Sequence, residues 1–433
     1  MQMKKVLLIT VGGSPQPIID SVTKHQPDYI VFLCTARKDG DEGSYDSIYK
    51  DTTQPPRKCP KCGHTETTTN KALASALGLS NDRFETLVVE ADKPFDTYKK
   101  ACDLIEKFQH NGWRVIADYT GGTKSMSAGL LLAAVEYKDI VISLVAGPRK
   151  DLIKIRDGEQ VCRRVNNKAV AFRQSRQALA MAREWNYPAA INLLDELCHD
   201  GLDDEVPDFN RLRNLCRGFG YWDTFIYDKA YEYLKPFGND GKIQPLIIKL
   251  STAWRGLQWY SSPTSGKFPG YVLVYDVLAN AERRAARGSY DDAIARIYRA
   301  LEMYAQFCLL AKGLNSSNLD TAKLPEPIRP DYEARRNAKG EIQIGLVEDY
   351  ELLAKLGDPV GQTWLKHKGK VLEALQKRNY SFLAHGINPL TQTDYKYVKD
   401  AIWPFISECD EVQKVKNGLS GWLDLNDQLK CVW

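Results

Sequence analysis

The sequence predicts an α/β Rossmann-like N-terminal domain with a mostly parallel sheet, followed by an all-α region. Up to about residue 166, short runs rich in β-branched residues alternate with stretches of helical length, which is typical of strand–helix–strand units. From residue 169 onward the apolar residues recur with helical spacing. We therefore expect an α/β domain over 1–166, a helical linker domain over 167–265 and a helical bundle over 266–433.

Five short apolar runs predict the strands of the sheet. They cover residues 4–11, 29–34, 83–89, 115–118 and 140–145. The stretch between the last two runs, residues 125–137, has the pattern of a helix. Strands that alternate with helices in this way predict an open sheet in which ligands bind beyond the carboxyl ends of the strands.

The second half of the chain predicts helices joined by short turns. Two helical hairpins are expected at 182–191 and 286–294, and Ser289 is expected to cap the second helix of the later hairpin. Residues 261–266 are expected to form a linker. Residues 314–345 are rich in Pro, Asn and charge, and predict a long surface loop.

Composition excludes several classes of protein. The chain is 43% hydrophobic and 26% charged, and no run approaches the ~18 apolar residues that indicate a membrane span. No secretion signal is evident at the N-terminus, and the 10 cysteines lack the regular spacing of a disulfide framework. A net charge of +4 does not suit a bulk nucleic-acid coat. We expect a cytoplasmic protein with reduced thiols and no membrane partner.

Two glycine-bearing turns follow predicted strands, at residues 10–16 and 118–125. In the second turn, Gly121 and Gly122 allow close backbone approach to a phosphate, while Thr123 and Lys124 add a hydroxyl and a cation at a helix N-terminus. This combination predicts an anion-binding cradle. Neither turn has the spacing of a Walker A loop or of Gly-x-Gly-x-x-Gly, so ATP hydrolysis and NAD binding are disfavoured. The alternative is that the glycines only permit tight turns.

Cys59 and Cys62, with His64 close behind, resemble half of a zinc knuckle. They supply two or three ligands, so a structural zinc ion would need a further ligand, such as Cys34 or a residue of a second subunit. The alternative is an exposed insertion without metal. No general base lies nearby in the sequence, so any zinc there would be structural.

Arg378 and His385 are seven residues apart on what the sequence predicts to be one helix. Seven steps fall about 20° short of two turns, which would put both side chains on one face about 10 Å apart. Arginine can hold a phosphate and histidine can transfer protons near neutral pH, while Asn379 could orient the scissile group. Two copies meeting across a twofold axis would form a basic cleft suited to cutting RNA without metal.

The alternative is a surface arginine and a capping histidine without catalytic role. Phe382 and Leu375 are expected to belong to a buried stripe beside the pair, which favours the catalytic interpretation. His367, among Lys366, Lys368 and Lys370, is expected to lie on a solvated basic face. The histidines without a comparable neighbour are His25, His64, His110 and His199.

The Gly121–Lys124 turn in an α/β half, followed by Arg378-x6-His385 and a glycine in a helical half, resembles the CARF and HEPN ribonucleases accessory to type III CRISPR systems. The resemblance covers the architecture of the whole chain, but only short segments by residue. It implies a homodimer in which the α/β half is CARF-like and the bundle over 266–433 is HEPN-like. It also implies that the chain is linked to the CRISPR effector through a second messenger.

That messenger would be a cyclic oligoadenylate, such as cyclic tetra- or hexa-adenylate, which acts as an allosteric activator. The residues implied to contact it are Thr10, Gly12, Gly13, Ser14, Gln16, Thr120, Gly121, Gly122, Thr123, Lys124 and Ser125. The implied activity is metal-independent cleavage of single-stranded RNA, and a 2′-hydroxyl nucleophile would leave 2′,3′-cyclic phosphate ends.

Two other interpretations fit the same residues. The first is a catalytically silent nucleotide sensor whose helical half binds a partner protein. The second is a helical interaction scaffold on a Rossmann base with an unrelated small ligand.

Overall fold

The structure of the chain is a computed structural model. It describes residues 3–36, 43–53, 57–58, 65–66, 69–146, 149–150, 154–155, 159–163, 166–263, 268–382, 386–416 and 418–433. The chain divides into two compact units, Met1–Ser175 with Leu197–Pro207 and Arg176–Glu196 with Asp208–Trp433. The division into three domains stays a prediction. Within the described ranges, no helix is long and apolar enough to cross a membrane.

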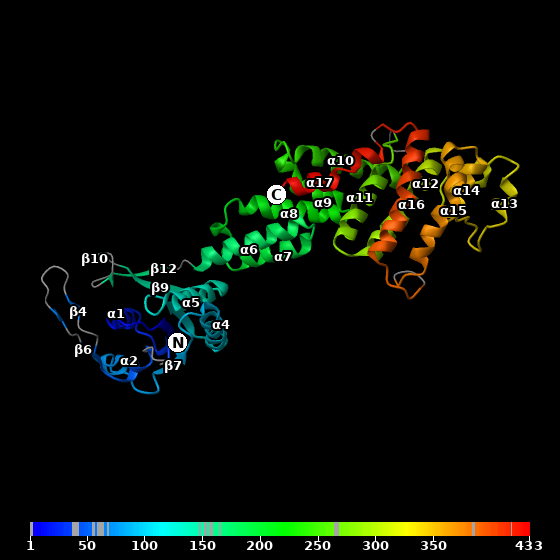
Figure 1. The fold of residues 1–433 in the computed structure, drawn as a ribbon. Helices are drawn as coiled ribbons and strands as arrows, with labels where there is room; N and C mark the ends of the chain where they lie inside the picture. The colour runs from blue at the N-terminus through cyan, green and yellow to red at the C-terminus, as the bar shows by residue number, and fades with distance from the viewer. Residues whose placement is uncertain are drawn as a thin grey trace. The chain divides into compact units, whose positions relative to one another are not determined.

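A six-stranded sheet lies at the centre of the first unit, in the order β12-β9-β8-β1-β2-β7 (Figure 1). Its strands are β1 (Lys5–Thr10), β2 (Tyr29–Cys34), β7 (Phe84–Val88), β8 (Arg114–Asp118), β9 (Val141–Ala146) and β12 (Glu159–Arg163). The strands from β9 to β7 pair in parallel, and β12 pairs antiparallel with β9. The predicted mostly parallel α/β sheet is therefore confirmed, and β12 adds an edge strand to the five expected.

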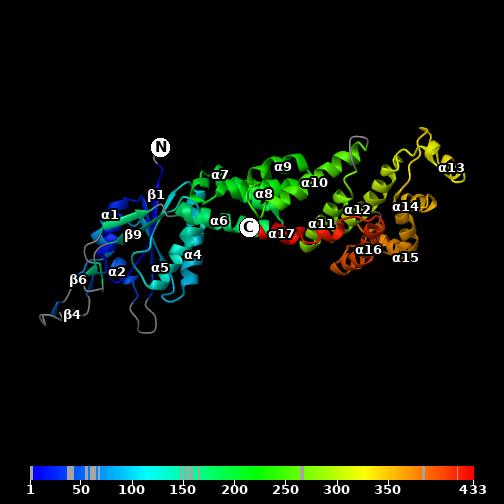
Figure 2. The same ribbon diagram turned by 90° about the horizontal axis from the view of Figure 1, so that it is seen from above.

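Helices cover both faces of this sheet. The long ones are α1 (Gln16–His25), α4 (Pro94–His110) and α5 (Lys124–Glu136). Side chains of successive strand residues point to opposite faces, so Val6 and Leu8 pack toward α4 and α5, whereas Leu7 and Ile9 pack with Ile18 of α1. Figure 2 shows α1 on the side of the strands opposite to α4 and α5. Because neighbouring parallel strands end together, the loops after β1 and β8 lie at one edge of the sheet.

Short elements interrupt the first unit. They are α2 (Asp46–Tyr49), α3 (Leu73–Ala76), the pairs β3 (Thr52–Thr53) with β6 (Thr69–Asn70) and β4 (Arg57–Lys58) with β5 (Thr65–Glu66), and the pair β10 (Arg149–Lys150) with β11 (Lys154–Ile155). Cys59 and Cys62, at which the sequence predicts a structural zinc, lie outside the described residues. The zinc stays a prediction.

The rest of the chain is helical. Its helices are α6 (Asn166–Arg183), α7 (Tyr187–His199), α8 (Phe209–Asp223), α9 (Tyr227–Leu234), α10 (Gln244–Ser261), α11 (Val272–Ala286), α12 (Tyr290–Ala311), α13 (Arg329–Glu333), α14 (Leu346–Lys355), α15 (Pro359–Asn379), α16 (Gln392–Val412) and α17 (Leu425–Cys431), with short 3₁₀ turns at Asp203–Glu205, Lys235–Phe237, Thr321–Lys323 and Leu419–Trp422. The expected all-α region is confirmed. Ser289 occupies the N-cap position of α12 as predicted, but its side chain makes no capping hydrogen bond.

The core of the second unit forms where α12, α14, α15 and α16 pack together. The ring of Trp364 on α15 stacks on that of Tyr350 on α14, with centroids 4.7 Å apart and an interplanar angle of 13°. Phe405 of α16 meets both rings edge-on. These buried aromatic rings fix α15, whose last turn carries Arg378, against α14 and α16.

Residues 314–345 differ from the surface loop that the sequence predicts. They include α13 and bury apolar side chains, among them Leu319, Tyr332 and Ile342. Backbone bonds also tie the segment together, because Leu319 N donates to Ile342 O at 2.8 Å. The sequence did not indicate these buried residues, because their spacing is irregular and the segment around them is rich in Pro, Asn and charge.

Candidate functional site

The two predicted glycine turns meet at the ends of the neighbouring strands β1 and β8. Thr10 Oγ1 donates a hydrogen bond of 2.7 Å to Gly121 O. A Cβ on Gly12 would lie 2.7 Å from Gly122 N, and a Cβ on Gly121 would lie 2.3 Å from Thr10 O. Larger residues would push the two turns apart, so both glycines are needed for this close approach.

The second turn leads directly into the N-terminus of α5. Thr123 is the N-cap, and its Oγ1 accepts a hydrogen bond of 3.2 Å from Met126 N and donates to Ala91 O. Lys124 is the first helical residue and is exposed, and Ser125 follows it. The first backbone N–H groups of a helix have no intrahelical acceptor and carry partial positive charge. This end of the sheet can therefore attract an anion.

The remaining residues of the predicted cradle lie beside these turns. Thr120 Oγ1 accepts a hydrogen bond of 2.8 Å from Val145 N, which ties the second turn to β9. Gly13 and Ser14 lie in the loop before α1. Gln16 is the first residue of α1 and is exposed, but its Nε2 donates to Asp20 Oδ1 at 2.7 Å on its own helix.

A buried polar network lies beneath the turns, and the sequence did not indicate it. Asp118 is fully buried, and its Oδ2 accepts hydrogen bonds from the hydroxyls of Ser21 and Ser143 at 2.7 and 2.9 Å. Asp118 Oδ1 accepts a hydrogen bond of 2.9 Å from Thr120 N. This carboxylate therefore holds the start of the second turn. Its partners come from α1 and β9, which no local sequence pattern connects.

His25 takes part in the same network, which the sequence did not indicate. Its Nε2 lies 2.9 Å from Ser143 Oγ, which in turn bonds to Asp118. Burial lowers the pKa of His25 below its usual value, although the negative charge of Asp118 acts in the opposite direction. The imidazole is thus favoured in its neutral form at physiological pH.

In the helical unit, Arg378 lies in the last turn of α15 and stacks on Tyr298 of α12. Its guanidinium carbon lies 4.7 Å from the centroid of the Tyr298 ring, and Nη1 donates to Asn379 Oδ1 at 3.4 Å. Tyr298 is half-buried, so the ring is fixed by the core while one face remains available to the guanidinium. Arg378 is thereby held at the surface in one orientation. The sequence did not indicate Tyr298, because it is far from Arg378 in the chain.

The prediction that Arg378 and His385 share one helix is wrong, because α15 ends at Asn379. Asn388 N donates to Tyr380 O at 3.1 Å, and Phe382 N donates to Asn388 O at 3.3 Å. These bonds compete with continuation of the helix, because they turn the backbone at Asn388 back toward the end of α15. A Cβ on Gly386 would lie 2.0 Å from Tyr380 O, so this return requires glycine. His385 itself lies outside the described residues.

Large apolar side chains are exposed on this loop. Tyr380, Phe382 and Ile387, which we call the apolar loop cluster, are 60%, 64% and 78% exposed. The expectation that Phe382 is buried is therefore wrong. The expectation for Leu375 is correct, because it is 5% exposed. Phe382 lies beyond the end of α15, so it does not follow the helical face that buries Leu375.

Asp349 is a buried carboxyl whose charge acts on Tyr298. It is fully buried in the first part of α14, and desolvation raises the pKa of its carboxyl to about 7. The Ser316 hydroxyl beside it and the negative charge of Glu302 are weaker influences on this pKa. Asp349 and Glu302 also raise the pKa of the Tyr298 hydroxyl, whereas Arg378 lowers it; burial is the largest cause of the raised pKa. A carboxyl whose pKa is raised by burial therefore lies near the ring on which Arg378 stacks.

No group of three or more His, Cys, Asp or Glu side chains that could hold a metal ion is found in the part of the chain that the structure describes.

Residues 264–408 match the family model for the Csm6 HEPN domain. Among solved structures, Enterococcus italicus Csm6 bound to cyclic hexa-2′-fluoro-hexa-dAMP is similar over 99% of this chain and 100% of that chain, with a TM-score of 0.57 and 14% sequence identity. At that identity the likeness shows the fold. Can2 from Sulfobacillus thermosulfidooxidans in complex with cyclic tetra-adenylate covers 54% of this chain and 68% of that chain at 12% identity, and its TM-score of 0.25 supports no argument. No protein with a curated description matches the chain in sequence at a significant level.

Proposed function

We propose that this chain, a Csm6-like CARF and HEPN protein of type III CRISPR systems, is a single-stranded RNA endoribonuclease that cyclic oligoadenylate activates. The observation that carries the proposal is the fixed Arg378. It lies within the segment that matches the Csm6 HEPN domain, and it is held at the end of α15 by its stack on Tyr298. A fixed cation at the protein surface suits the charge that builds on a phosphate during cleavage.

The proposed reaction requires no metal. The 2′-oxygen of the RNA attacks the adjacent phosphorus, the bond to the 5′-oxygen breaks, and a 2′,3′-cyclic phosphate forms. One group must accept the proton of the 2′-hydroxyl and another must give a proton to the leaving 5′-oxygen. We assign these roles to His385 from two protomers, phosphate binding to Arg378, and orientation of the scissile group to Asn379.

A second copy of the chain is the partner that this assignment needs. The apolar loop cluster supports a homodimer, because Tyr380, Phe382 and Ile387 expose apolar area beside Arg378. Exposed apolar clusters of this kind commonly mark protein interfaces. If the apolar loop clusters of two copies packed against each other, the two segments that contain His385 would lie close to one another.

We further propose that the cradle formed by the turns after β1 and β8 binds cyclic oligoadenylate. Its glycines permit close approach to phosphates, and Lys124 with the start of α5 supplies positive charge. The Csm6 structure that shares this fold contains a cyclic hexanucleotide analogue, which supports cyclic hexa-adenylate as the ligand. Cyclic tetra-adenylate is the second candidate. Residues 1–166 would then bind the ligand, residues 266–433 would cut RNA, and residues 167–265 would connect these two parts.

The test is incubation of the full chain with labelled single-stranded RNA in chelator, with and without cyclic tetra- and hexa-adenylate. Cleavage that depends on one of the rings, with cyclic phosphate ends, supports the proposal. Binding of a ring without cleavage would instead support a silent sensor. The absence of both would refute the proposed function and favour a scaffold.

A further inference from the structure

A cavity of about 370 Å³ lies among the helices of the second unit, apart from Arg378 and from the glycine turns. Residues of α10, α11 and α12 line it together with Phe225, in the turn before α9, and Tyr227, the first residue of α9. Its walls are mainly aliphatic and include Leu257, Leu273, Val277, Ala295 and Met303. A cavity of this size and polarity is within the range of sites that bind small molecules.

Two arginines, Arg296 and Arg299 of α12, are the charged side chains that line this cavity in the described part of the chain. Carboxylates pair with both guanidiniums, Asp292 with Arg296 and Glu302 with Arg299, but neither acid lines the cavity. The cavity wall therefore presents the N–H donors of two ion-paired guanidiniums.

Arg296 has unused bonding capacity. Its Nε donates to Asn280 Oδ1 at 2.6 Å and its Nη1 donates to Asp292, but no acceptor for Nη2 is found among the described residues. Burial lowers the pKa of Arg296 to about 10, and the nearby charges of Arg284 and Arg283 contribute to the decrease. The negative charge of Asp223 acts in the opposite direction. A partly desolvated guanidinium whose Nη2 lacks an acceptor among the described residues can still donate to an added anion.

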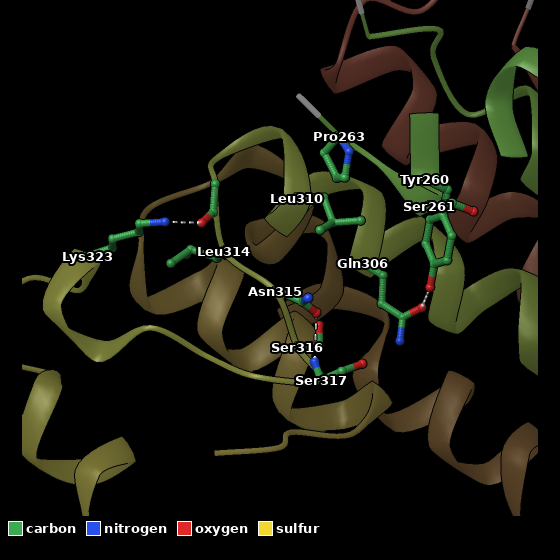
Figure 3. A pocket seen from close by; sticks show the side chains of 11 residues that line it. Tyr260, Ser261, Pro263, Gln306, Leu310, Leu314, Asn315, Ser316, Ser317 and Lys323 are labelled. Carbon is green, nitrogen blue, oxygen red and sulfur yellow. Dashed lines mark hydrogen bonds between the residues drawn. The ribbon is translucent and has the colours of Figure 1, made fainter. Parts of the chain in front are cut away.

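The wall beside Arg299 is held in place by hydrogen bonds. Arg299 Nη2 donates to the Tyr260 hydroxyl at 3.1 Å, and Nη1 donates to Gln306 Oε1 at 3.1 Å. The Tyr260 hydroxyl donates in turn to Gln306, as Figure 3 shows from the side of a neighbouring polar pocket. Tyr260 lines both pockets and separates them. The arginine and its wall are thus preorganised, which lowers the cost of binding a ligand.

We propose that this cavity binds a small aliphatic carboxylate, with its chain against the apolar walls and its carboxylate on Arg299 and Arg296. The walls match an apolar chain, and the planar guanidiniums match a carboxylate. A neutral chain of the same length would gain the apolar contacts but would not form charge-assisted hydrogen bonds with the guanidiniums. The proposal is independent of RNA cleavage and of cyclic oligoadenylate.

The probe is decanoate, and decanol is its neutral control. Binding to the full chain is measured by calorimetry and by the rise in Tm that a ligand of the folded state produces. We expect saturable binding of one decanoate per chain and at least about tenfold weaker binding of decanol, which corresponds to the ~1.5–3 kcal/mol of a charge-assisted hydrogen bond. Equal affinities for the two probes would overturn the proposal.

Three variants locate the site. Arg299→Met keeps the apolar stem, and we expect about tenfold weaker binding of decanoate with unchanged binding of decanol. Ala295→Leu fills the cavity from a partly exposed position, and it should abolish the binding of both probes. Arg335→Met is the matched control, because Arg335 also lies over an aromatic ring, that of Tyr332, but outside the cavity. Decanoate affinity that Ala295→Leu leaves unchanged, or that Arg335→Met lowers as much as Arg299→Met does, would refute the site.

Discussion

Tyr298 offers a sharp test of how Arg378 is positioned. The guanidinium carbon of Arg378 lies 4.7 Å from the centroid of the half-buried Tyr298 ring. Cation–π contacts are worth about 0.5–1 kcal/mol when exposed and about 2 kcal/mol when desolvated. For a half-buried ring we take about 1 kcal/mol. If Arg378 acts on the transition state, Tyr298→Leu should therefore lower kcat about fivefold.

Tyr298→Phe is the matched control, because it keeps the ring and removes only the hydroxyl. We expect near-parental kcat for Tyr298→Phe and similar KM for both variants, measured on labelled single-stranded RNA with saturating activator. Loss of core packing alone would lower the Tm of Tyr298→Leu without this difference in kcat. Equal kcat in Tyr298→Leu and the parental chain, or an equal loss in both variants, would refute the positioning role.

Three further predictions test the remaining assignments. His385→Ala should abolish RNA cleavage and leave the affinity for cyclic oligoadenylate unchanged; cleavage at the parental rate would show that the site is misassigned. Lys124→Ala should raise the activator concentration needed for half-maximal cleavage about fivefold, for a loss of about 1 kcal/mol, whereas Lys99→Ala on the exposed face of α4 should not. Desolvation raises the pKa of Asp349 to about 7 from 3.8, so the folded state retains a proton that the unfolded state releases, and stability falls as pH rises through this window. Asp349→Asn should therefore raise the free energy of unfolding by about 2–4 kcal/mol at pH 8 and change it little near pH 4. Urea unfolding at the two pH values measures this difference, and an equal change at both would contradict the reasoning.

The sequence by itself determined the class of fold and the position of the two glycine turns after strands of the sheet. Buried strands such as β1 and β2 are almost wholly apolar, and the chain has no other way to hide such runs than a covered parallel sheet. The sequence also put Gly12 and Gly121 after predicted strands, whereas their close approach depends on the pairing of β1 with β8. The sequence also predicted the helices of the second half, because apolar residues that recur about every 3.6 positions can be recognised within a short stretch of chain.

Only the tertiary structure decided the surroundings of Arg378. Residues 380–385 contain no helix breaker, so local rules continue α15 to Gly386. The helix instead ends at Asn379, because Tyr380 and Phe382 bond to Asn388 across the loop. The stack on Tyr298 and the burial of Asp349 likewise depend on how α12, α14 and α15 pack. Contacts between residues far apart in the chain leave no trace in local spacing, and they override weak local preferences when they satisfy backbone groups or bury apolar area.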